Sequence, residues 1–146
     1  VHDIHAAEDI AIDAFSDLVV NKHRYNFKVT LKTYLFMIGR SRALNYIKRR
    51  KIIDFVTLSE AENVSSELEA LEGTVLRDEK KRVVNNALAS LPDDMRVVIH
   101  LIYFEDMSYD EAGRVMKKSR KQVDNLLYRA KKELRIILGK DGELLL

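Results

Sequence analysis

Two closely spaced helix-start signals near the end of the chain predict a helix-turn-helix. Ser108 and Glu111 have the S-x-x-E spacing of a helix N-terminus, and Ser119 and Gln122 have the related S-x-x-Q spacing eleven residues later. These signals leave room for a first helix of about two turns, a short turn around residues 117–118, and a second helix. Apolar residues at helical spacing predict one buried stripe along the second helix. The stripe consists of Val123, Leu127, Ala130, Leu134 and Ile137.

Helical spacing also predicts two helices in the first third of the chain. Residues 6–20 form an amphipathic pattern that Asp3 can cap, and Phe15 is expected in the core. Residues 21–26 are polar and predict a loop. The second helix is expected to begin near residue 29 and to end at Lys51, because its last four residues are cations, which favourably oppose the negative end of the helix dipole.

A proline separates two further helices that precede the helix-turn-helix. The first is expected over residues 75–90, and Leu91 ends it because a residue before proline avoids helical backbone. Pro92 then opens the next helix, with acidic residues at its positive end. The apolar residues expected to bury this helix are Met95, Val98, Ile99, Leu101, Ile102 and Phe104.

Composition supports an all-α fold made of two small helical modules. The 146 residues include five Gly and one Pro, so few positions interrupt helices. Residues 22–51 contain ten Lys or Arg and no acid, whereas residues 52–76 contain six acids and no Lys or Arg. The last third of the chain is basic again. We therefore predict two anion-binding modules, residues 1–51 and 75–146, joined by an acidic linker over residues 52–74.

The sequence argues against several classes of function. Without Cys the chain has no disulfides and no Cys-ligated metal, which fits a cytoplasmic protein. His2 and His5 have no third ligand at metal-binding spacing, so we expect no metal. No nucleophile is paired with a base by spacing, so we predict no catalytic residues, no enzyme activity and no cofactor. No signal-peptide pattern is found, and no apolar run is long enough for membrane insertion.

The second helix of the helix-turn-helix is cationic away from its apolar stripe. Arg120, Lys121, Asn125 and Arg129 lie largely off that stripe. A helix packed on one side and cationic on the other fits a DNA major groove. The alternative from the residues alone is a solvated amphipathic helix pair, which is what most charged helical faces turn out to be.

The chain carries three motif segments in order: AEDIAIDAF at residues 7–15, KTYLFMIGRSRALNYIKRRK at residues 32–51, and LASLPDDMR to RAKKELR over residues 88–135. In this order they resemble the extracytoplasmic-function sigma factors of bacterial RNA polymerase, the compact members of the sigma-70 family. The first is similar to the acidic helix of region two, A-E-D-[IL]-x-Q-[ED]-x-F. The second resembles the W-L-x-x-I-A-R-N-x-x-x-D-x-x-R-R helix of that region. The third resembles region four, which starts L-P-x-x-x-R-x-[VA] and ends R-A-[RK]-x-x-L.

Several positions depart from the family pattern. Tyr34 replaces the usual Trp, and Ile12 replaces the usual Gln. The family's E-I-A in the first helix of the helix-turn-helix is E-A-G here, and Gly113 costs that helix about 1 kcal/mol relative to Ala. Asp124 and Leu126 stand where the second helix usually carries Lys and Arg, so no promoter sequence is carried over from the family.

The start of the chain also departs from the family. Residue 1 is Val rather than Met, and five residues precede the acidic helix where the family has its first region-two helix. We therefore expect that part of the native N-terminus is missing. We also expect the first module to be short of core.

The resemblance implies a division of labour between the modules. Region four is expected to read the −35 element in duplex DNA, and region two to read and melt the −10 element by stacking unpaired bases and following the backbone. The implied −35 residues are Ser119, Arg120, Lys121, Gln122, Asn125 and Arg129. The implied −10 residues are Tyr25, Phe27, Tyr34, Arg40, Arg42, Asn45, Lys48, Arg49 and Arg50. Core packing is an equally open role for Tyr34.

The implied partners are promoter DNA, core RNA polymerase and, as a further candidate, an anti-sigma factor. Glu8 and Asp9 are expected on the surface that meets the polymerase. Two alternatives stay open. One is a helix-turn-helix transcription regulator that acts without polymerase. The other is a degenerate sigma-like module that binds a protein partner but neither promoter DNA nor polymerase.

Overall fold

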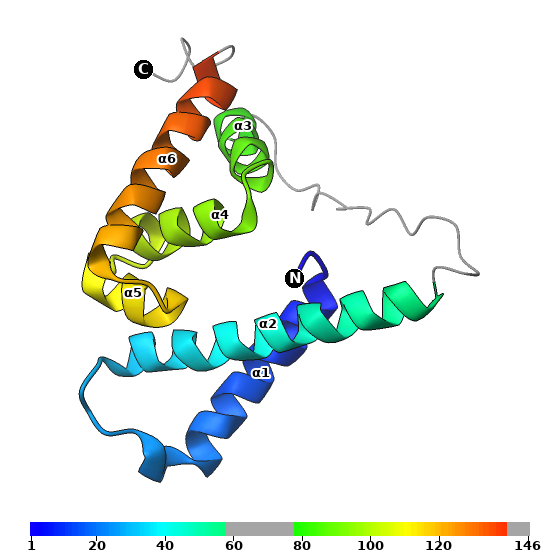
Figure 1. Cartoon of the computed structure of the whole chain (residues 1–146), viewed down its shortest axis with the longest axis vertical. Helices are drawn as coiled ribbons and strands as arrows, with labels where there is room; N and C mark the ends of the chain where they lie inside the picture. Colours follow the sequence, from blue (N-terminus) through cyan, green and yellow to red (C-terminus); the bar gives the residue numbers. More distant parts are fainter. Residues whose placement is uncertain (58–77, 140–146) are drawn as a thin grey trace. The chain divides into compact units, whose positions relative to one another are not determined.

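The computed structural model describes residues 1–57 and 78–139, which form helices joined by short turns, with no strand among them (Figure 1). The chain divides into two compact units, Val1–Ala70 and Leu71–Leu146, and each is described by itself. The first contains α1 (Ile4–Val20), the 3₁₀ turn η1 (Lys22–Arg24) and α2 (Leu31–Thr57). The second contains α3 (Asp78–Ala89), α4 (Asp93–Ile99), the π-helical turn η2 (His100–Phe104), α5 (Tyr109–Met116) and α6 (Arg120–Gly139). The predicted all-α fold is confirmed.

The helix ends in the first unit test two predictions. The Asp3 side chain accepts hydrogen bonds from the backbone N–H groups of His5 and Ala6, at 3.0 and 3.2 Å, so the predicted cap of α1 is confirmed. The predicted end of the second helix at Lys51 is wrong, because α2 continues to Thr57. No Gly or Pro follows the cations to stop it. The first six residues of the predicted linker are thus helical, and its residues 58–74 lie outside the described part of the chain. Although α2 has 27 residues, neither it nor any other described helix has the apolar character that a membrane span requires.

An ion pair ties α1 to α2. The Arg42 guanidinium lies 3.2 Å from the Asp17 carboxylate. Hydrogen bonds from the Asn21 amide and from Arg42 hold the pKa of Asp17 below its ordinary value of 3.8. A lowered pKa favours the ionised carboxylate in the folded state. The tie is therefore present at neutral pH and is lost only as the pH falls below the ordinary carboxyl range.

The expectation that Phe15 lies in the core is wrong, because 57% of its surface is exposed. In the described part of the first unit the buried residues are Ala14 on α1 and Thr33 on α2. Ile12, Phe15 and Val19 recur at i, i+3 and i+7, so they share a face of α1 that differs from the face of Ala14. Since α2 is the main neighbour of α1, it covers one of these two apolar faces and leaves the other open.

The second unit has a continuous core built around α6, which packs against α3, α4 and α5 (Figure 1). Val98 and Leu101 on the α4 side and Val123, Leu127 and Ala130 on α6 are each at most 2% exposed. Burial of each large apolar side chain contributes about 1.5–3 kcal/mol. The predicted stripe of α6 is confirmed to Ala130, and beyond this residue it is half-buried.

The fourth helix begins as predicted but ends in an unexpected way. Pro92 precedes α4, and two acids occupy the first helical turn. The chain then widens into η2, where the Glu105 N–H donates to the His100 carbonyl at 3.1 Å. The prediction that Phe104 is buried is wrong, since 58% of it is exposed. The wider turn changes the helical phase, and the Phe104 ring stacks on His100 with 5.2 Å between centroids.

Reciprocal side-chain bonds begin both helices of the helix-turn-helix. Ser108 Oγ accepts from the Glu111 N–H at 3.1 Å, and the Glu111 carboxylate accepts from the Ser108 N–H at 3.0 Å. Ser119 and Gln122 repeat this exchange at 3.2 and 2.8 Å. Such caps contribute about 1 kcal/mol each because they satisfy N–H groups that have no partner inside the helix. The predicted helix-turn-helix and both of its start signals are confirmed.

The turn between α5 and α6 depends on Gly113. A Cβ at this residue would lie 2.5 Å from the backbone carbonyl oxygen of Lys118, far inside van der Waals contact. The Lys118 N–H also donates to the Gly113 carbonyl at 2.9 Å. The chain therefore folds back directly over the glycine. The residue that lowers the helix propensity of α5 is the one that the turn requires.

Replacement of Gly113 by Ala should lower the free energy of unfolding of the second unit by about 1–3 kcal/mol, because the turn must move to admit the methyl group. Gly39→Ala is the matched control. A Cβ at Gly39 meets nothing within 4 Å, so this change should leave stability equal or higher by up to about 1 kcal/mol. Urea titrations followed by circular dichroism measure both. Equal stability of the two variants would contradict the role of the close approach.

Candidate nucleic-acid interface

The second unit presents a polar face of α6 opposite its buried stripe. With 3.6 residues per turn, Lys121, Asn125 and Arg129 fall on the side away from Val123, and all three are exposed. Arg120 lies one residue earlier, nearer the turn, and 72% of its side chain is exposed. These four side chains, which belong to the set of six predicted to contact DNA, are therefore accessible to a groove.

The other two predicted residues, Ser119 and Gln122, have their acceptor oxygens engaged in the cap of α6. The Gln122 amide still has its two N–H donors, and the Ser119 hydroxyl still has one. Asp124 is exposed on the same helix, whereas Leu126 is 5% exposed and belongs to the core. Position 126 is thus a packing position in this chain, and the cationic surface lies toward the helix start.

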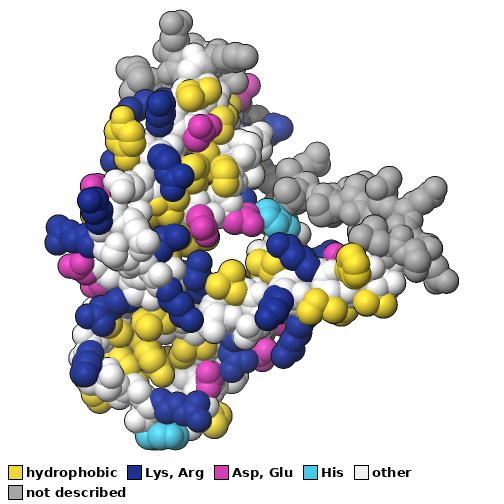
Figure 2. Space-filling model, viewed as in Figure 1, with side chains coloured by type: hydrophobic (Ala, Val, Ile, Leu, Met, Phe, Trp, Pro, Cys, Tyr) yellow, Lys and Arg dark blue, Asp and Glu magenta, His cyan; other side chains and the backbone are white. Residues whose placement is uncertain are grey.

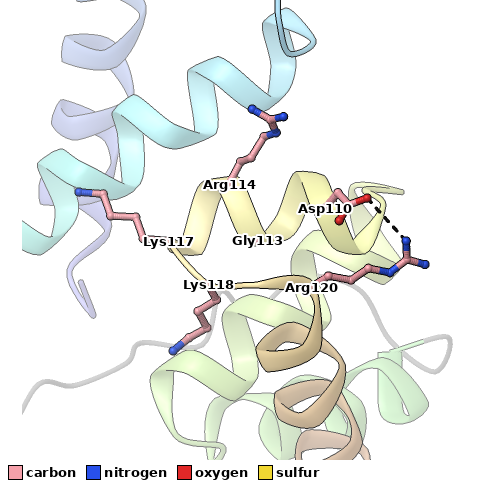
Figure 3. A pocket seen from close by; sticks show the side chains of 6 residues that line it. All are labelled: Asp110, Gly113, Arg114, Lys117, Lys118 and Arg120. Carbon is pink, nitrogen blue, oxygen red and sulfur yellow. Dashed lines mark ion pairs between the residues drawn. The ribbon is translucent and has the colours of Figure 1, made fainter.

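A hollow of about 380 Å³ lies beside the turn between the two helices (Figure 3). It is lined by Asp110, Gly113, Arg114, Lys117, Lys118 and Arg120. In Figure 3 the side chains of Arg114, Lys117 and Lys118 point outward from the turn, whereas Arg120 reaches back toward Asp110. Lys117 and Lys118 were predicted to be turn residues, but the hollow and the contribution of α5 were not predicted. The run K-K-S-R at residues 117–120 was the sequence signal that could have indicated an anion-binding site at this turn. Consecutive cations outside a helix do not oppose a helix dipole, so that explanation of their presence does not apply.

Lys117 has an unusual backbone conformation in the turn. Its φ and ψ are 54° and 47°, in the left-handed region, where a residue with a Cβ is disfavoured by about 1–2 kcal/mol. Its neighbour Lys118 does not share this conformation and lies 4.0 Å from the Asp94 carboxylate of α4. Two adjacent lysines thus have different backbone environments within one cationic turn.

In the first unit, the three aromatic residues predicted to stack bases lie together. The ring centroid of Tyr25 is 4.6 Å from that of Phe27 and 5.1 Å from that of Tyr34. The Tyr25 hydroxyl donates to the Val29 carbonyl, which fixes the loop before α2. Phe27 is 84% exposed and has a φ of 61°, uncommon for a bulky residue. We call Tyr25, Phe27 and Tyr34 the aromatic cluster, with Phe27 as its exposed member.

One face of α2 continues from the aromatic cluster. By helical spacing, Asn45, Lys48 and Arg49 fall on the same side of α2 as Tyr34. These three polar side chains are exposed. Figure 2 shows dark blue Lys and Arg side chains next to yellow hydrophobic ones along this unit, so the cations lie on a surface that is apolar in part.

The remaining predicted cations of α2 lie elsewhere. Arg40 and Arg50 fall away from that face by helical spacing, and Arg50 contacts the Tyr46 hydroxyl at 3.4 Å. Arg42 is engaged with Asp17 of α1. The structure therefore gathers only part of the predicted set around the aromatic cluster, and the role of the other cations in DNA binding stays a prediction.

The acidic pair on α1 is on the surface. Glu8 and Asp9 are both exposed. They precede the exposed apolar stripe that includes Ile12, so this part of α1 presents acids and apolar side chains together. Contact of this surface with a polymerase stays a prediction.

The chain is similar in sequence and in fold to known sigma factors. Residues 81–134, from α3 into α6, match the family model described as sigma-70, region 4. The ECF RNA polymerase sigma factor SigM of Bacillus subtilis is 27% identical over 138 residues, which cover 94% of this chain and 83% of that protein. The RNA polymerase sigma-H factor of Pseudomonas aeruginosa is 28% identical over 142 residues, which cover 92% of this chain and 74% of that protein. A similar fold is found in the solved structure of the sigma factor RpoE in complex with the anti-sigma factor NepR from Bartonella quintana. The TM-score is 0.72 and the sequence identity is 20%, and the match covers 90% of this chain and 80% of that chain.

Replacement of Lys117 by Gly should raise the free energy of unfolding of the second unit by about 0.5–1 kcal/mol, because glycine adopts left-handed backbone without a Cβ clash. Lys118→Gly is the control at ordinary backbone and should lower it by a similar amount, because it adds freedom to the unfolded chain and removes the weak ion pair with Asp94. Urea titration of both variants measures the difference. A loss of stability at residue 117 as large as that at residue 118 would rule out relief of strain.

Proposed function

Because the chain belongs to the extracytoplasmic-function sigma factors of the sigma-70 family, we propose that it directs core RNA polymerase to promoters through contacts with both the −35 and the −10 element. We assign the first unit as region two and the second unit as region four. One observation supports this proposal best: the same chain carries two different candidate DNA-binding surfaces. The second unit has a helix-turn-helix with a cationic second helix, and the first unit has the aromatic cluster beside the cationic helix α2. We expect the protein to act in the cytoplasm, where bacterial polymerase works.

In the second unit, α6 is the helix that enters the major groove. Lys121 and Asn125 lie on its exposed face and can hydrogen bond to base edges. Arg120 and Arg129 flank them and can contact phosphates, which fix the register of the helix on the duplex. The caps hold the start of α6 in a defined position, so these side chains approach the groove from a rigid support.

In the first unit, the aromatic cluster is the candidate for capture of unpaired bases. Phe27 is largely exposed and is supported by the Tyr25 ring, so one face of an aromatic platform is open to a base. Stacking on such a side chain contributes about 1–3 kcal/mol per base. Asn45, Lys48 and Arg49 continue along α2 from this platform and can follow the phosphates of a melted strand.

Protein partners complete the proposal. We assign Glu8 and Asp9 to the contact with core polymerase, because they form an exposed acidic pair on α1. An anti-sigma factor is a further candidate partner, since a protein of the same fold was solved with one. Neither contact requires a cofactor.

The two alternatives are less favoured. A regulator that acts without polymerase would use the second unit alone and would leave the aromatic cluster without a role. A module that only binds proteins would have no use for the exposed cations of α6. Relatives named as sigma factors align over at least 92% of this chain in the cases of SigM and sigma-H, which favours the sigma-factor function over both.

Arg120→Ala and Lys121→Ala should each weaken binding to a −35-type duplex while leaving the thermal melting of the protein unchanged. A lost base contact costs about 1–3 kcal/mol, and each lost phosphate contact lowers the salt slope by about one. Fluorescence anisotropy at several salt concentrations measures both quantities on a duplex that the wild-type holoenzyme selects from a random library. Lys80→Ala and Lys81→Ala, which remove exposed cations of α3, are charge controls and should change neither. Unchanged affinity and slope at positions 120 and 121 would exclude them from the interface.

Transcription reconstituted with core polymerase tests the function itself. The wild-type chain should support initiation, and a Lys48→Ala, Arg49→Ala double variant should form open complexes at least about fivefold less well, because two exposed cations on the face that continues from the aromatic cluster are lost. Its binding to −35-type duplex should change much less. A wild-type chain that binds duplex but neither binds core polymerase nor starts transcription would favour the polymerase-independent regulator. Equal open-complex formation by the double variant would leave Lys48 and Arg49 without a role in melting.

A further inference from the structure

The first turn of α6 places cationic side chains at the positive end of the helix dipole. Arg120 and Lys121 are its first two residues, and residues 120–123 contain no acid. The start of a helix carries partial positive charge, so cations there are unfavourable by about 0.3–1 kcal/mol each. Ser119 satisfies a backbone N–H group at this end but supplies no negative charge. An anion from another element would offset this arrangement.

Asp110 supplies such an anion from the neighbouring helix. It lies in the first turn of α5, and its carboxylate is 3.7 Å from the Arg120 guanidinium. Of the four cations drawn in Figure 3, Arg120 is the one whose side chain reaches toward this acid across the hollow. The two side chains are 67% and 72% exposed, so water screens the pair and its net strength is below about 1 kcal/mol. A stronger anion can therefore displace the carboxylate at little cost.

A DNA phosphate is the anion that the proposed function brings to this place. A duplex that contacts the exposed face of α6 places its backbone near the start of this helix, where the hollow and its cations lie. Arginine binds phosphate with two parallel hydrogen bonds in a favourable geometry. At 3.7 Å the contact with Asp110 is a charge contact rather than a tight hydrogen bond.

We propose that Asp110 is a stand-in for a backbone phosphate of DNA: it positions Arg120 in the free protein and releases it when duplex DNA binds. This inference rests on the proposed function and adds a positioning residue to it. Because the carboxylate must be displaced whatever the sequence, Asp110 lowers affinity for all duplexes alike. Base contacts from Lys121 and Asn125 are unaffected by this exchange. Non-specific complexes rely mainly on phosphate contacts, so the same loss is a larger share of their total binding free energy.

The test uses the full chain and a mixed-sequence 30-base-pair duplex, because a phosphate contact needs no promoter. Asp110→Asn should tighten binding at low salt by about two- to fivefold, the value of an exposed ion pair. The salt slope should also steepen by up to about one, because Arg120 no longer exchanges one anion for another. Asp110→Glu keeps the negative charge, so its affinity and salt slope should equal those of the wild type. Glu133→Gln removes the same charge from α6 about 20 Å farther along the helix, and should have little effect.

The same measurement in an Arg120→Gln background separates positioning from general electrostatics. If Asp110 acts through Arg120, Asp110→Asn should change nothing in that background. A gain that persists there, or no gain in the wild-type background, overturns the inference. When inorganic phosphate replaces chloride at equal ionic strength, Asp110→Asn should still tighten duplex binding. Loss of that effect would indicate that the hollow binds free phosphate rather than the DNA backbone. A chain that starts transcription but binds no mixed-sequence duplex alone also overturns the inference, while the proposed function stands.

Discussion

The second unit depends on one close approach between backbone segments, in which the carbonyl oxygen of Lys118 lies only 2.5 Å from where a Cβ of Gly113 would be. Because the glycine lets the chain fold back at once, three residues separate α5 from α6. Ser119 is then placed to begin α6, and the buried stripe of this helix meets the core of α4. The position of Arg120 beside Asp110 follows from the same turn. The exposed cationic surface of α6, which we propose binds DNA, therefore follows from backbone packing.

The two units hold their binding surfaces by different means. In the second unit a continuous apolar core fixes α6, so the exposed side chains inherit its rigidity. In the first unit the described residues bury little, and the surface depends on local contacts: the ion pair of Asp17 with Arg42, the stacking within the aromatic cluster, and the hydrogen bond from the Tyr25 hydroxyl. Such contacts are individually weak, so this surface can rearrange more easily than that of the second unit.

Local signals explain what the sequence predicts well. Caps depend on residues three apart, so the starts at Ser108 and Ser119 were predictable, as was the all-α fold. The errors arise where spacing alone does not decide the outcome. Periodicity marks Phe15 and Phe104 as apolar but does not show which helix face is covered or that a π turn changes the phase. Pairs between elements, such as Asp110 with Arg120, have no sequence period, and the hollow is formed by such neighbours.

The division of the chain into two units has a consequence for the strength of each contact. The 20 residues between Thr57 and Asp78 can span at most about 70 Å, whatever their conformation. In the proposed function, binding of one unit to DNA confines the other unit within that reach. Each surface then needs only modest affinity, because the second encounter is intramolecular. Avidity of this kind would let two surfaces of modest affinity together hold promoter DNA more tightly than either surface could alone.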